Sequence, residues 1–82
     1  MTILKTSLWY IGGTSDKVYQ VTLTQNAEGN YVLTAQWGRR GKSLQSQTKG
    51  TYAEQWAATR EFHNLVASKT AKGYRVTEKT HA

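Results

Sequence analysis

Residues 17–37 read KVYQVTLTQNAEGNYVLTAQW, and this stretch decides the fold. Apolar and polar residues alternate on either side of a turn-forming segment, Asn26-Ala27-Glu28-Gly29. One face of the two halves carries the apolar side chains Tyr19, Val21, Leu23, Tyr31, Leu33, Ala35 and Trp37. Alternation with a period of two around a turn that contains glycine predicts an antiparallel hairpin with one buried face.

Two further strands are predicted beside this hairpin. Residues 3–11 mix β-branched, aromatic and apolar side chains, which is typical of a strand, and Gly12-Gly13 ends it. Residues 43–49 are polar and predict a weaker strand at the edge of the sheet, where Lys49 discourages further pairing. Residues 74–77 are compatible with a short returning strand or with a docked tail.

A helix is predicted over about residues 52–72. Thr51 and Glu54 have the spacing of a capping box at its start, and Gly73 stands where a helix commonly ends. Apolar residues recur between these ends at spacings of three and four: Ala58, Phe62, Leu65 and Val66. The expected fold is therefore α+β, a small antiparallel sheet of about four strands with one long helix packed on it.

The chain is expected to be one domain. Its 82 residues are too few for two domains, and three Trp, five Tyr and one Phe supply the apolar area for one core. We expect residues 1–76 to form the domain and residues 77–82 to be a flexible tail. Because no cysteine and no long apolar run occur, we expect no disulfide, no metal or cofactor, no membrane contact and a cytoplasmic location.

The positive charge is concentrated in two segments. Eleven Lys and Arg against five Asp and Glu give a net charge of +6. Residues 1–38 sum to zero and residues 51–68 to −1, whereas residues 39–50 carry +4 and residues 69–82 carry +3. Solubility explains a net charge of this size but not its segregation, which predicts a surface for an anionic partner.

The sequence contains no set of side chains that is spaced to act together in catalysis. Two histidines, His63 and His81, have no acid or base spaced to work with them, and the five acids form no pair suited to carboxylate catalysis. No metal-ligand spacing and no glycine-rich phosphate loop is present. His63 is expected to be a partly exposed helix residue, and the protein is expected not to be an enzyme.

The segment Trp37-Gly38-Arg39-Arg40-Gly41-Lys42 has the composition of an anion-binding site. An aromatic ring stacks on a base or sugar, and arginine binds phosphate through two N–H groups. Flanking glycines let backbone N–H groups approach an anion. Trp37 also continues the apolar face of its strand, so a core position is equally compatible, and Trp9 and Trp56 are expected in the core or at its edge.

Structural roles compete with binding at three of the cations. Arg39 is also compatible with a bridge to the sheet or the helix. Lys69 and Lys72 stand in the last turn of the predicted helix, where positive charge compensates the helix dipole.

The string Trp37-Gly38-Arg39 resembles the signature of the WGR domain. This domain is known from DNA-dependent poly(ADP-ribose) polymerases and from many bacterial proteins. The resemblance covers about residues 4–76 and continues in order through Asp16-Lys17-Val18-Tyr19, Gly41, Gln45, Ala58, Phe62, Val66, Lys69-Thr70 and Gly73-Tyr74.

The resemblance implies an antiparallel sheet with a packed helix, and binding at DNA breaks. It implies that Trp37 packs against a sugar or base at the terminus of a DNA strand. It also implies that Arg39 contacts the DNA backbone or a neighbouring domain. Asp16 departs from the family, in which a polar residue at this place lies near the 5′-phosphate, because a carboxylate repels phosphate. Arg40 replaces a residue that is usually apolar, and no polymerase catalytic domain is present.

The sequence leaves two functions open. The first is a nucleic-acid-binding module without sequence preference, for duplex DNA rather than RNA, at ends, nicks or backbone. The residues expected to bind are Trp37, Gly38, Arg39, Arg40, Lys42, Lys49, Lys17, Lys72 and Arg75. The second is a protein-interaction or regulatory module that docks on a partner protein through the same surface, with Trp37 as an anchor.

Overall fold

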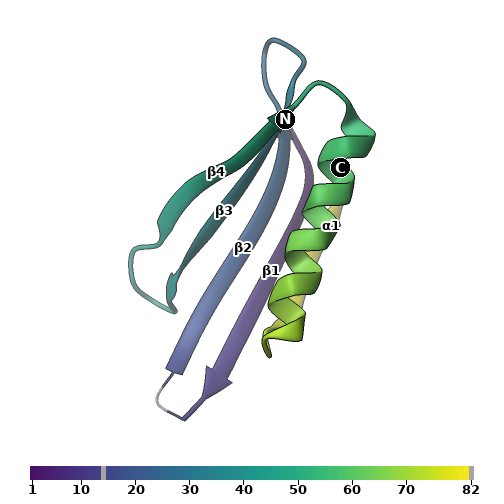
Figure 1. Cartoon of the computed structure of the whole chain (residues 1–82). Coiled ribbons are helices and arrows are strands. Elements are labelled where there is room, and N and C mark those ends of the chain that lie inside the picture. Colours follow the sequence, from purple (N-terminus) through teal and green to yellow (C-terminus); the bar gives the residue numbers. More distant parts are fainter. Residues whose placement is uncertain (14, 82) are drawn as a thin grey trace.

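The computed structural model describes residues 1–13 and 15–81. In chain order its elements are β1 (Thr2–Gly12), β2 (Ser15–Gln25), β3 (Tyr31–Arg39), β4 (Gln45–Tyr52), α1 (Gln55–Ala71) and β5 (Arg75–His81). All strand pairs are antiparallel, the strand order is β4-β3-β2-β1-β5, and α1 lies against the sheet (Figure 1). The fold is therefore α+β as predicted, with five strands where about four were expected.

The β2–β3 hairpin follows the alternation in the sequence. Val21 pairs with Ala35 and Leu23 with Leu33, and all four side chains are buried. In the turn, the side-chain Oδ1 of Asn26 accepts hydrogen bonds from the backbone N–H groups of residues 28 and 30. This side chain therefore satisfies two donors that strand pairing leaves free, which confirms the predicted turn.

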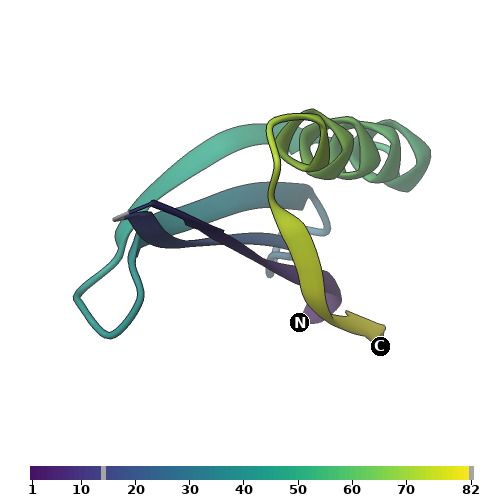
Figure 2. The same ribbon diagram turned by 90° about the horizontal axis from the view of Figure 1, so that it is seen from below.

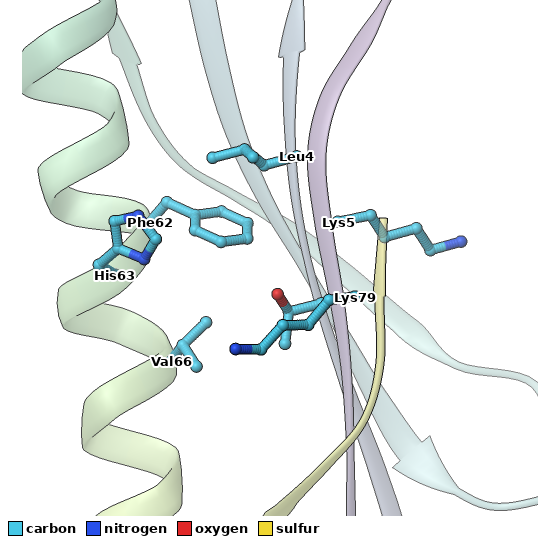
Figure 3. A pocket seen from close by; sticks show the side chains of 7 residues that line it. Leu4, Lys5, Phe62, His63, Val66 and Lys79 are labelled. Carbon is cyan, nitrogen blue, oxygen red and sulfur yellow. The ribbon is translucent and has the colours of Figure 1, made fainter. Parts of the chain in front are cut away.

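The core lies between the sheet and α1. Its fully buried apolar residues are Leu8, Tyr19, Val21, Leu23, Leu33, Ala35, Ala58 and Phe62. We call the side of the sheet under α1 the helix face and the other side the open face; Figure 2 shows α1 on one side only. In Figure 3, Leu4 points toward α1 and Lys5 points away from it, as the alternation in a strand requires. Within the described residues α1 is the one helix, and it is too short and too polar to cross a membrane.

The start of α1 differs from the prediction. The helix begins at Gln55, with Glu54 as an extended N-cap residue, and no side-chain hydrogen bond caps it. The capping box that we predicted is wrong, because Thr51 belongs to β4 and pairs there with Val32. Strand pairing thus takes the residue that the local pattern assigns to the helix.

The end of α1 is as predicted. Gly73 has a φ of 105° and follows the C-cap residue Lys72. Tyr74 N–H donates to the Lys69 carbonyl at 3.1 Å, and Gly73 N–H donates to the Thr70 carbonyl at 3.1 Å. These two hydrogen bonds satisfy the last carbonyls of the helix and turn the chain back toward the sheet.

The C-terminal residues form a fifth strand. Arg75 pairs with Trp9 of β1 and Lys79 with Thr6, and Thr77 Oγ1 donates to the Ser7 carbonyl at 3.2 Å. We expected a flexible tail over residues 77–82, whereas residues 77–81 belong to β5 and Ala82 lies outside the described residues. The pairing covers a β1 edge that would otherwise leave backbone groups without partners.

Candidate nucleic-acid interface

Trp37 lies on the helix face near the end of β3. It pairs with Tyr19 of β2, and the two rings stack with their centroids 6.1 Å apart and 19° between their planes. Trp37 is half-buried and packs against the core through part of its surface. The sequence left open whether Trp37 lies in the core or is accessible. In the structure one part of the side chain packs against the core and the other part is accessible.

An open hollow with a volume of about 290 Å³ adjoins Trp37. Its lining consists of Tyr19, Trp37, Lys49, Lys69 and Tyr74, and we call it the aromatic–lysine hollow. Lys49 Nζ lies 5.6 Å from the centre of the Trp37 ring, and Lys69 Nζ lies 4.4 Å from the centre of the Tyr19 ring. Attraction to the ring faces favours both positions, and Lys49 Nζ also donates a hydrogen bond to Gln47 Oε1 at 2.9 Å.

A β-bulge places Lys49. Thr34 of β3 pairs with Thr48 and Leu33 pairs with Gly50, so Lys49 is the extra residue of β4 between two regular pairs. Such a bulge changes the direction of the side chain that it contains. The bulge thereby brings a residue of an exposed edge strand over the helix face.

The aromatic–lysine hollow is positively charged, because no carboxylate lies in its described lining beside the lysines. Burial lowers the pKa of Lys69 below its usual 10.5, and repulsion first from Lys72 and then from Lys49 lowers it further. Burial also raises the pKa of Tyr19. No carboxylate occurs among the described residues that line the hollow. An anion placed there would therefore relieve a repulsion that the fold maintains.

Lys17 and Arg39 extend this positive surface. They pair across β2 and β3, two positions beyond Tyr19 and Trp37, and both are exposed. Because side chains alternate along a strand, this pair faces the same side as the hollow. Arg39 also attracts Asp16, whose pKa it helps to lower.

Arg40 lies elsewhere, on the open face. Its Nε donates to Asp16 Oδ1 at 3.2 Å and Oδ2 at 3.3 Å, and its Cζ lies 4.5 Å from the centre of the Trp9 ring. Trp9 Nε1 donates to the same Oδ1 at 2.6 Å. We call these three residues the Trp9 cluster. The hydrogen bonds from Trp9 and then Arg40 lower the pKa of Asp16 below its usual 3.8.

The remaining predicted site residues are divided between the two faces. Lys72 is the C-cap residue that follows α1 and lies close enough to Lys69 to repel it. Arg75 pairs with Trp9, which puts it on the open face. Lys42 belongs to the β3–β4 loop, which projects away from the side of α1 in Figure 2. The structure therefore brings together fewer of the predicted cations than the sequence suggested.

Gly38 has a packing role. A Cβ at this position would lie 3.2 Å from Leu44 Cδ2, so the missing side chain lets the β3–β4 loop pack against the strand. Gly38 also pairs with Val18 inside the sheet.

Three residues of the hollow were not predicted as site residues: Tyr19, Tyr74 and Lys69. The alternation places Tyr19 on the helix face, but only the packing of the C-terminal end of α1 over β2 brings Lys69 to its ring. Trp56 is 65% exposed, so its predicted place at the core edge is wrong; Arg60 lies over its ring at 5.2 Å.

Within the described residues no group of three metal-ligating side chains occurs.

Comparison with known proteins identifies the family. No curated protein and no solved structure shows significant similarity to the chain. The sequence profile of the WGR domain matches residues 6–81, which include the hollow and the Trp9 cluster. Because this match covers nearly the whole chain, the protein belongs to the WGR domain family.

Proposed function

We propose that this WGR domain binds duplex DNA through the helix face, at the end of the sheet where α1 ends. The observation that carries the proposal is the aromatic–lysine hollow, where two ammonium groups lie over aromatic rings with no carboxylate in the lining. The cations assigned to phosphate contacts are Lys17, Arg39, Lys49, Lys69 and Lys72. Membership of a family of nucleic-acid-binding and regulatory modules supports this function.

The proposed contacts are with phosphate groups and carry no base preference. Lysine ammonium groups are point charges that bind backbone oxygens of any sequence. Arg40 is left out of this surface because Asp16 already pairs with it on the open face. The proposed domain is a binding module without catalysis of its own.

Half-burial of Trp37 favours DNA ends or nicks over intact duplex. A ring that packs partly against the core and lies under Lys49 Nζ has no free plane to insert between stacked base pairs. At an end or a nick, a sugar or a terminal base presents an accessible surface, and contact with the remaining part of the indole ring suffices there.

A salt titration tests the phosphate contacts. Anisotropy of a labelled linear duplex is measured at several salt concentrations, and five neutralised phosphates predict a slope of log K against log salt of about −4.5, at about 0.9 for each phosphate. Lys69→Gln is expected to weaken binding and reduce the slope by about 0.9. The matched control is Arg60→Gln, on α1 but beside Trp56, and it is expected to keep the slope.

The preference for ends has a separate comparison. A linear duplex is set against a dumbbell of the same sequence whose two ends are closed by hairpins, and tighter binding to the linear form is expected. Absence of binding to either DNA at low salt would overturn the proposed function. A different pair of results would instead support protein docking through this surface. Trp37→Ala and Arg39→Ala would bind DNA as weakly as wild type does, and a partner protein would co-purify with wild type but not with these two variants.

A further inference from the structure

A second hollow on the helix face borders the proposed DNA surface. It has a volume of about 310 Å³, and its lining comes from β3, β4 and α1. We call it the Glu61 hollow, and the residues that line it are Leu33, Lys49, Tyr52, Glu61, Asn64 and Leu65. Lys49 also lines the aromatic–lysine hollow, so the two hollows adjoin the same lysine side chain.

Apolar and aromatic side chains form the inner part of the Glu61 hollow. Leu33 is buried, and Leu65 and Tyr52 pack against the core. A Cβ at Gly50 would lie 2.5 Å from Tyr52 Oη, although the φ of Gly50 is not positive and the backbone does not call for glycine there. The missing side chain at position 50 therefore leaves room for the Tyr52 ring, and bases stack on such rings.

Two polar side chains of α1 complete the lining of the Glu61 hollow. Glu61 and Asn64 are three residues apart, and residues at this spacing are neighbours on a helix surface. The ionic partner of Glu61 among the described residues is Arg60, at 3.8 Å and with both side chains exposed, and such a pair is weak. Within residues 1–13 and 15–81 the side-chain amide of Asn64 has no hydrogen-bond partner. Both polar groups are therefore available to a ligand.

These groups suit a nucleobase better than a phosphate or a protein side chain. The Glu61 carboxylate repels a phosphate, but it accepts hydrogen bonds from the N–H groups of a base. A basic side chain of a protein would pair with Glu61 too, but Lys49 and Lys69 beside the hollow would repel it. A nucleotide satisfies both charges, because its phosphate binds Lys49 while its base enters the Glu61 hollow.

We propose that the Glu61 hollow binds one unpaired base of a single-stranded overhang at a DNA end, and that Glu61 selects bases with an amino group. Guanine fits best, because its ring N–H and its amino group donate to the two carboxylate oxygens together. Thymine offers a single ring N–H. Base pairing occupies this edge in a duplex, so only an unpaired base presents it. The inference rests on the proposed DNA binding and adds a base preference that the phosphate contacts lack.

Duplexes that differ only in a short overhang test the proposal. The overhang consists of thymines, with or without one guanine at each position in turn, on the 3′ or the 5′ strand, and a blunt duplex of the same sequence is the reference. Anisotropy measures binding to each. For one strand polarity and one position, guanine is expected to raise the affinity about tenfold over thymine, which is within the discrimination that one bidentate base contact supplies.

Glu61→Gln is the decisive variant, and Glu54→Gln is its matched control. Glu54 is the N-cap residue of α1 and does not line the hollow, so this variant makes the same charge change elsewhere on the helix. Loss of an acid raises the affinity for every DNA, so the ratio of guanine to thymine binding is the readout. This ratio is expected to fall below about threefold in Glu61→Gln, which keeps one acceptor oxygen, and to stay near tenfold in Glu54→Gln.

The outcomes separate this inference from the proposed function. If the blunt duplex binds but guanine and thymine overhangs bind equally, the inference is overturned and the proposed function stands. The same holds if folded Glu61→Gln keeps the full guanine preference. Absence of binding to every DNA would overturn both. Circular dichroism checks that each variant is folded, which is expected because Glu61 lies on the exposed side of its ion pair with Arg60 rather than in the core.

Discussion

Trp37 and Arg40 belong to one short string of sequence but lie on opposite faces of the sheet. Trp37 stacks on Tyr19 under the C-terminal end of α1, whereas Arg40 stacks on Trp9 and pairs with Asp16. Arg40 follows the last residue of β3, and its contacts with Asp16, a backbone hydrogen bond of 3.0 Å and the ion pair, hold it on the open face. The segment from Trp37 to Arg40 therefore contributes to two surfaces, and the residues on each should respond differently to substitution.

Arg40→Gln is expected to lower stability without changing the salt slope of DNA binding. The substitution removes the ion pair with Asp16 and the contact with Trp9 but no proposed phosphate contact. The Tm and the slope are measured on the same preparation. Lys49→Gln serves as the comparison, with a slope reduced by about 0.9 and a small change in Tm. A slope that falls equally in both variants would place Arg40 on the DNA.

Asp16→Asn is expected to destabilise the protein at neutral pH but not in strong acid. Hydrogen bonds from Trp9 and Arg40 hold the pKa of Asp16 below its usual 3.8, so the folded state favours the carboxylate. The resulting stabilisation is present above pH 3.8 and is lost as pH falls through the lower folded pKa. Tm values of both proteins across the acid range measure this, and a gap that persists well below that range would contradict it.

Lys69 is expected to titrate below pH 10.5 in the free protein. Burial is the main cause, followed by repulsion from Lys72 and Lys49. NMR of the lysine ε-carbons follows its titration; Lys72→Gln should raise the midpoint, Lys49→Gln should raise it less, and Lys5→Gln should leave it unchanged. Bound DNA should raise it too, because a nearby phosphate favours the ammonium form. An unaltered midpoint with DNA would argue against a phosphate at Lys69.

Gly73→Ala is expected to cost more stability than Gly13→Ala. Both glycines have positive φ, 105° and 58°, but a Cβ at Gly73 would lie 3.0 Å from Tyr10 Cε2, whereas Gly13 has open space. We expect a loss of about 1–2 kcal/mol at Gly13 from the left-handed backbone alone. At Gly73 strain of up to about 3 kcal/mol adds to the displacement of Tyr10. Urea unfolding measures both, and a loss at Gly73 no larger than the loss at Gly13 would contradict this prediction.

Removal of residues 77–82 is expected to destabilise the domain. The truncation takes away pairs such as Lys79 with Thr6 and opens the edge of β1. Each backbone hydrogen bond contributes about 0.5–1.5 kcal/mol net, so a loss of more than about 1 kcal/mol is expected in urea unfolding. A truncated protein as stable as the full chain would mean that these residues behave as the flexible tail that the sequence suggested.

Local patterns were informative where one face of an element is buried. The alternation around Asn26–Gly29 predicted the hairpin and its buried residues, and the glycine at position 73 predicted the end of α1. They failed where a competing partner lay far away in the chain. Residues 74–77 were compatible with a short strand, but residues 77–81 are polar and were expected to be a tail, and pairing with the edge of β1 makes residues 75–81 one strand. Thr51 is taken by β4 for a similar reason.

The same division applies to the candidate site. Composition and alternation are properties of the chain alone, and they indicated the sheet and an excess of cations near Trp37. The family was indicated by the resemblance of Trp37-Gly38-Arg39 and the ordered residues around it to a known signature. Which cations meet depended on contacts between distant segments. The bulge at Lys49 and the packing of α1 over β2 bring two lysines to one hollow. A third cation, Arg40, pairs with Asp16 and therefore lies on the open face. Distances between segments far apart in the chain are set by tertiary packing, and the spacing of residues in the sequence does not predict them.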